Sequence, residues 1–108
     1  MAITIHIFYS GINGNARKFA EEMVSCGIVR EIRKEKGNLR YDYFFPMEDA
    51  ETVLLIDSWS DQEALDIHHK TPMMQRIVAL REKYDLHMKV ERYESAEVPS
   101  GDHSYIRK

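Results

Sequence analysis

The sequence predicts one α+β domain whose elements follow in the order β-α-β-β-α-β. Four segments alternate apolar and polar residues as strands do, and two longer segments repeat apolar residues at helical spacing. The length of 108 residues suits a single domain, and 44% apolar with 31% charged residues is the balance of a globular protein. This order is the split-βαβ arrangement, a four-stranded antiparallel sheet with both helices on one face.

The first strand is predicted over residues 3–9. Alternate isoleucines share one face with Tyr9, while His6 and Phe8 share the other. Glycines and asparagines at 11–15 break this pattern and supply a cap for a following helix.

The first helix is expected from about residue 15 to residue 35, where apolar residues recur on one face. Cys26 falls within that apolar stripe, so we expect it to pack in the core. It is the only cysteine, which excludes an intrachain disulfide or a multi-cysteine metal site and fits a reducing compartment.

The second and third strands are predicted to form a hairpin. Leu39 to Phe45 is rich in aromatic residues, with Leu39, Tyr41, Tyr43 and Phe45 on one face, and Pro46 ends the strand before a polar turn. Residues 52–59 contain a Val-Leu-Leu-Ile run that is apolar on both faces, which places this strand inside the sheet.

The second helix is expected to start at a capping box formed by Ser60 and Glu63. Thr71-Pro72 should interrupt it near residue 70 and restart it toward Tyr84. The last strand is predicted over residues 86–93.

Two regions follow from these elements, a domain over residues 1–95 and a C-terminal tail over residues 96–108. The tail has turn composition and is expected to be loose or to cross to a partner subunit. Both helices cover one sheet face, yet the strands carry large apolar residues on both faces. The open face should therefore be an interface, and a homodimer is the simplest arrangement.

The charge and hydropathy of the sequence argue against nucleic-acid and membrane partners. The formal net charge of −3, with acidic and basic residues intermixed, leaves no basic stripe for nucleic acid. No apolar stretch approaches the ~20 residues of a membrane helix and no signal peptide is evident, so no membrane partner and a cytoplasmic location are expected.

An ordered set of motifs resembles the antibiotic biosynthesis monooxygenase family over residues 2–94. The set consists of a Gly-x-Leu-x-Tyr run, a polar hairpin, a Trp-x-Asp-x-x-Ala-Leu run and a His-x-x-Thr-Pro run, which here are Gly37 to Tyr41, Glu48 to Glu51, Trp59 to Leu65 and His68 to Pro72. The resemblance implies a ferredoxin-like dimeric α/β-barrel with a pocket between the sheet and the helices of each subunit. It also implies a monooxygenase that oxidises a small aromatic, a quinol or polyketide-like phenol, with O2 and with neither metal nor flavin.

The same resemblance suggests which residues act. His68 matches the family's histidine on the second helix and suits a general base. His69 points about 100° away on a helix and is expected to be solvated. Trp59 matches the tryptophan that ends the third strand, where its ring could wall the pocket and its N–H could bind a substrate oxygen.

Further residues complete the predicted pocket. Asp57 shares a strand face with Trp59 and could orient His68, as a carboxylate among apolar neighbours must be paired or shifted in pKa. Tyr41 by its motif position, and Tyr43 and His6 by strand parity, are candidate substrate-binding groups, although dimer packing also explains the tyrosines. Met73 stands where many family members place another histidine, and it offers an apolar wall instead.

Two alternatives to a monooxygenase stay open, and a third is disfavoured. An isomerase of a small signalling molecule or lactone would use the same base without oxygen, and a non-enzymatic dimer would only bind a ligand or a protein. Haem degradation is disfavoured because residues 74–80 on the second helix contain no histidine to bind iron.

Overall fold

A computed structural model describes the whole chain, residues 1–108. Its elements are β1 (Ile3–Ser10), α1 (Asn15–Ser25), α2 (Ile28–Arg33), β2 (Asn38–Phe44), β3 (Thr52–Trp59), α3 (Gln62–His69), α4 (Met73–Lys83), β4 (His87–Glu94) and a 3₁₀ helix, η1 (Ser100–Tyr105). The predicted order of strands and helices is confirmed, although each predicted helix is divided in two. No helix is long and apolar enough to cross a membrane.

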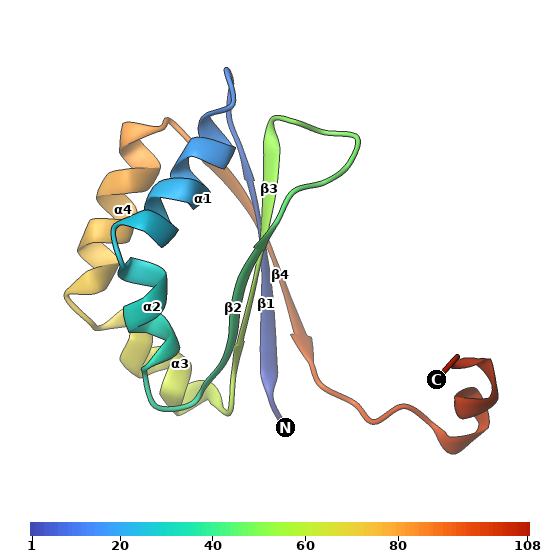
Figure 1. The fold of residues 1–108 in the computed structure, drawn as a ribbon. Coiled ribbons are helices and arrows are strands. Elements are labelled where there is room, and N and C mark those ends of the chain that lie inside the picture. Colours follow the sequence, from blue (N-terminus) through green and yellow to red (C-terminus); the bar gives the residue numbers. More distant parts are fainter.

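The four strands form one antiparallel sheet in the order β2-β3-β1-β4. All four α-helices cover the same face of this sheet, and the other face is left open (Figure 1). This arrangement is the ferredoxin-like α+β fold that the resemblance implied. β3 lies inside the sheet, as its two apolar faces predicted.

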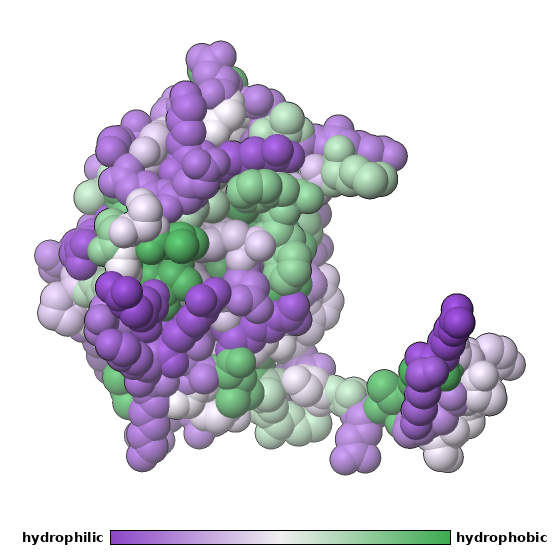
Figure 2. Space-filling view, in the orientation of Figure 1, coloured by the Kyte–Doolittle hydropathy of each residue, from purple (hydrophilic) through white to green (hydrophobic).

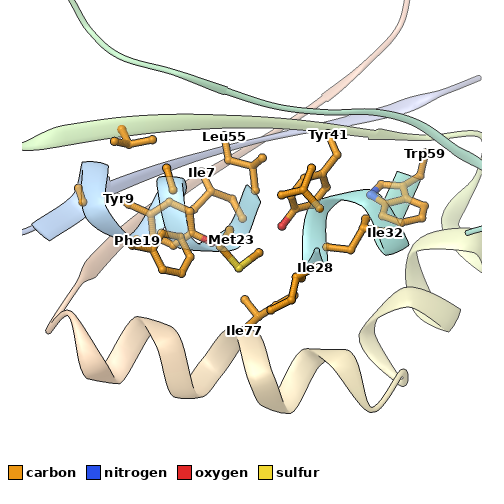
Figure 3. Packing of buried hydrophobic residues seen from close by; sticks show 14 of the residues in the cluster. Ile7, Tyr9, Phe19, Met23, Ile28, Ile32, Tyr41, Leu55, Trp59 and Ile77 are labelled. Atoms are coloured by element: carbon orange, nitrogen blue, oxygen red, sulfur yellow. The ribbon is translucent and has the colours of Figure 1, made fainter. Parts of the chain in front are cut away.

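The core lies between the sheet and the helices. Sixteen buried residues form it, and large side chains such as Tyr9, Phe19 and Trp59 are fully enclosed. Trp59 and Tyr41 point from the sheet toward the helices, on the same side as Ile28 and Ile77 (Figure 3). A site built from strand residues on this face is therefore closed over by helices.

The first predicted helix is broken where Gly27 adopts the left-handed conformation, at φ 90°. This glycine ends α1 and precedes α2, so the apolar stripe does not continue straight through the break. The prediction that Cys26 packs in the core is wrong, because Cys26 and Val24 are both exposed at the end of α1.

The second predicted helix is divided at the expected place, between His69 and Met73. The hydroxyl of Thr71 donates to the carbonyl of His68 at 2.8 Å and closes the end of α3. The predicted capping box is wrong, because Asp61 rather than Ser60 caps α3, its carboxylate accepting the Ala64 N–H at 2.8 Å.

β2 begins with an irregularity. Asn38 pairs with Trp59 and Arg40 pairs with Ser58, so Leu39 is an extra residue in this strand. Leu39 is 59% exposed and does not join Tyr41 in the core. The bulge therefore turns Leu39 away from the strand face on which the sequence pattern places it together with Tyr41 and Tyr43.

The tail leaves the domain after β4. The Ser95 N–H donates to the Ala2 carbonyl at 2.9 Å, and the chain then runs away from the sheet to η1 (Figure 1). Residues 96–108 are exposed throughout, including the apolar side chains of Val98, Tyr105 and Ile106.

Candidate functional site

The end of β3 places a carboxylate beside an indole in the core. Asp57 and Trp59 share the helix-covered face, and the Trp59 Nε1–H donates to Asp57 Oδ2 at 3.0 Å. Asp57 is buried, and its other oxygen, Oδ1, has no hydrogen-bond partner. Burial raises the pKa of Asp57, while the Trp59 N–H and the nearby His68 and His69 partly offset that rise.

His68 projects from α3 onto Trp59. The two rings are stacked, with centroids 4.6 Å apart and planes inclined by 30°. His68 is only 4% exposed, whereas its neighbour His69 is exposed. The expectation that only one of the two adjacent histidines turns inward is therefore confirmed, and that one is His68.

Glu35 completes this cluster, and no sequence motif indicates it. Its carboxylate oxygens lie 3.0 and 3.2 Å from His68 Nδ1. Counting side-chain atoms alone, His68 is 5% exposed and Glu35 is 15% exposed, so both side chains are enclosed. Glu35 sits in a run of charged residues at the end of the first helix, a pattern typical of a solvated helix end, and nothing local in it indicates a partner 33 residues away.

Gly37 explains why the end of α2 lies so close to α3. Its φ of 86° is left-handed, and a Cβ placed there would lie 2.5 Å from the Ala64 Cβ and 2.7 Å from the Ser60 Oγ. The Ser60 N–H also donates to the Gly37 carbonyl at 2.8 Å. Because the backbones approach this closely, Glu35 can reach His68.

Tyr41 and Tyr43 extend the cluster along β2. The Tyr41 ring lies 6.4 Å from the His68 ring and 6.0 Å from the Tyr43 ring, measured between centroids. Burial raises the pKa of both phenols, that of Tyr41 strongly, so both stay protonated at neutral pH. The hydroxyl of Tyr43 is buried without a hydrogen-bond partner.

A positively charged side chain, that of Arg81, also reaches the helix-covered face of the sheet. The guanidinium of Arg81 on α4 donates to the hydroxyl of Tyr9, with Nη2 at 2.9 Å and Nε at 3.2 Å. Tyr9 is fully buried, and burial raises its pKa while Arg81 opposes the rise. Sequence analysis missed this pair because 72 residues separate its members.

Two predicted pocket residues lie elsewhere or at the margin. His6 is on the open face of the sheet, where its ring packs 4.8 Å from that of Tyr93, so the structure does not bring it together with His68. The reason is strand parity, since Ile5 and Ile7 occupy the covered face of β1. Met73 begins α4 and packs, partly buried, against the core.

Two clefts border the cluster. An apolar cleft of about 490 Å³ lies between α1 and β2 and is lined mainly by Ala20, Val24, Tyr43, Phe44 and Phe45. Apolar side chains gather around this cleft on the face seen in Figure 2. A more polar cleft of about 290 Å³ opens at the other side, where Glu35, Ser60 and Thr71 are among the lining residues.

The fold and the site together define the class of protein, which is a ferredoxin-like α+β domain with a buried polar cluster between its sheet and its helices. Residues 2–80 match the model of the antibiotic biosynthesis monooxygenase family, and the chain belongs to this family.

Known relatives agree with this assignment. The chain is 33% identical over 52 residues to the protein named Putative monooxygenase YcnE of Bacillus subtilis, a match that spans 48% of the chain and 55% of the relative. The chain thus spans about half the length of that relative.

Solved structures share the fold. The crystal structure of a putative antibiotic biosynthesis monooxygenase from Deinococcus radiodurans has a TM-score of 0.77 and 21% identity, covering 93% of this chain and 97% of that one. SnoaB, a cofactor-independent oxygenase from Streptomyces nogalater, has a TM-score of 0.73 and 12% identity, covering 92% and 97%.

Proposed function

We propose that this protein is a monooxygenase that oxidises a small aromatic substrate, a quinol or polyketide-like phenol, with O2 and without a cofactor. The observation that carries the proposal is the enclosed His68, whose Nδ1 faces a carboxylate and whose Nε2 makes no hydrogen bond to the protein. A buried imidazole with one free nitrogen suits a base that removes a phenolic proton.

The reaction balances without a metal or flavin. His68 takes the phenolic proton, and the electron-rich phenolate then passes an electron to O2. One oxygen atom enters the substrate and the other leaves as water, with two electrons and two protons drawn from the substrate. The protein therefore has to supply a base, a site shielded from water and donors for the anion.

The surrounding residues take supporting roles in this proposal. Trp59 forms the wall on which His68 rests, and Asp57 holds the indole N–H. Tyr41 and Tyr43 would bind the substrate, since protonated phenols can donate to its oxygen and Tyr43 also lines the apolar cleft. Met73 would add an adaptable apolar wall.

The proposal includes a homodimer built through the open sheet face. Phe8, Leu54 and Phe44 are paired across three adjacent strands on that face, with Ile56 and Tyr93 nearby. Phe44 and Tyr93 remain 39% and 47% exposed. A second copy of the chain would cover this apolar row, because an identical face presents the same aromatic and aliphatic side chains.

The test is oxygen uptake by metal-stripped protein with a panel of quinols and polyphenols. The matched variants are His68→Ala and His69→Ala, which remove a buried and an exposed imidazole from the same helix end. We expect uptake by the wild type and by His69→Ala, and its loss in His68→Ala. No uptake above the uncatalysed rate with any substrate would contradict the proposal and favour an isomerase or a binding protein.

A further inference from the structure

We propose that Glu35 is the positioning residue for His68. Its carboxylate keeps a proton on Nδ1 of the neutral imidazole, so that Nε2 is the nitrogen that accepts the substrate's proton. The inference rests on the proposed role of His68 as a base, and it adds a residue that none of the sequence motifs contains.

The hydrogen bond to Glu35 decides which nitrogen of the neutral His68 ring carries the proton. Both Glu35 oxygens lie within 3.2 Å of Nδ1. An ionised carboxylate can only accept, so Nδ1 must donate, and a neutral ring must then be the Nδ1–H tautomer. Free imidazole side chains favour the other tautomer, and the Glu35 contact would reverse that preference.

The Glu35–His68 pair is largely shielded from water. Surface ion pairs are weak because water screens them, but this pair is 5% and 15% exposed. Because little water reaches the two groups, the hydrogen bond from Nδ1 to the carboxylate is not readily exchanged for one to water. Trp59 stacks on one face of the imidazole, so the ring cannot readily turn away from Glu35.

Glu35 lies between His68 and the polar cleft. Glu35 lines that cleft together with Lys36, Asp61 and Glu63. The other titratable groups near the His68 ring are Asp57, His69 and Tyr41. Glu35 therefore stands between the enclosed imidazole and the cleft, with its carboxylate on Nδ1.

The contact could instead serve only to fasten α3 to the end of α2. Two variants separate these roles. Glu35→Gln keeps an amide oxygen that accepts from Nδ1–H, whereas Glu35→Ala removes the acceptor. Glu31→Ala is the control, because it removes an exposed carboxylate of α2 that pairs only with Lys34.

The experiment combines long-range ¹H–¹⁵N NMR of the histidine rings with oxygen uptake. In the wild type we expect the neutral His68 ring to carry its proton on Nδ1. In Glu35→Ala the proton should move to Nε2 and uptake should fall about tenfold or more, while Glu35→Gln keeps the Nδ1–H tautomer and recovers part of the activity. Glu31→Ala should match the wild type in both measurements.

The two readouts also separate this inference from the proposed function. An Nε2–H tautomer in the wild type, or an Nδ1–H tautomer that persists in Glu35→Ala, would overturn the positioning role. A tautomer that switches as expected in a protein that consumes no oxygen would support the positioning role and contradict the monooxygenase.

Discussion

The imidazole of His68 lies on the indole of Trp59, with the two ring centroids 4.6 Å apart and the planes 30° from parallel. The stack holds the plane of the imidazole against the end of β3. Trp59 thus contributes to the site in two ways, through its ring face to His68 and through its N–H to Asp57.

Replacing Trp59 tests these two contributions separately. Trp59→Phe keeps an aromatic ring but leaves the buried Asp57 Oδ2 without its donor, and should lower the free energy of unfolding by about 1–3 kcal/mol. Trp59→Ala also removes the core packing and should cost about 3–5 kcal/mol. Urea unfolding measures both. Equal stability of Trp59→Phe and the wild type would mean that the N–H contributes nothing.

Asp57 should make stability depend on pH. Burial raises its pKa above the ordinary 3.8, so the folded protein binds this proton more tightly than the unfolded chain does. Its contribution to stability is therefore full below about pH 3.8 and is lost as pH rises through the folded-state pKa.

Asp57→Asn removes this titration while its side-chain oxygen can still accept the Trp59 N–H. The variant should gain stability relative to the wild type between about pH 4 and about pH 7. Urea unfolding of both proteins across this range measures the difference. A difference that stays constant or falls with rising pH would contradict the raised pKa.

Gly37→Ala should be strongly destabilising for two reasons. The new Cβ would clash with Ala64 and Ser60, and alanine would have to adopt the left-handed backbone conformation of this position. We expect a loss of more than about 3 kcal/mol in the free energy of unfolding. Gly14→Ala is the control, since Gly14 has a similar φ of 73° but a Cβ added there would meet no atom within 4 Å, and it should cost about 1–2 kcal/mol. Similar losses in the two variants would exclude the close approach as a cause.

Leu54→Lys should dissociate the proposed homodimer. Leu54 lies between Phe8 and Phe44 on the open face, and a buried unpaired charge there disfavours association. Val78→Lys, at an exposed position on α4, adds the same charge on the helical side and should leave the dimer intact. Sedimentation equilibrium distinguishes the two forms. A wild-type monomer, or a Leu54→Lys dimer of unchanged affinity, would contradict this interface.

The periodicity of the sequence is sufficient to predict the fold. Strand alternation and the Thr71-Pro72 interruption each act within a few residues, and the structure follows them closely. The prediction for Cys26 is wrong because the left-handed turn at Gly27 redirects the chain, and a helical pattern continued straight through that turn assigns the wrong face.

The site is less predictable because several of its contacts join residues that are far apart in the sequence. Trp59 and Asp57 share a strand face, which parity alone indicates. Glu35 gives no such signal, since its partner is on another helix and its neighbours are charged. Alternation along β1 separates His6 from Ile5 and Ile7 but does not say which of the two faces the helices cover, and the covered face is that of the isoleucines.

The pairing of β1 with β4 also bears on how the chain folds. Ile3 is paired with Glu94, so the strand nearest the N-terminus cannot complete its bonding until the last strand is available. Closing a loop of that length precedes any gain from the contact, and sheets that depend on such distant pairs fold slowly. During synthesis the β2-β3 hairpin can form early, whereas the edge of β1 that pairs with β4 stays without a partner until β4 has been made. That edge is the part of the unfinished protein most exposed to pairing with another chain.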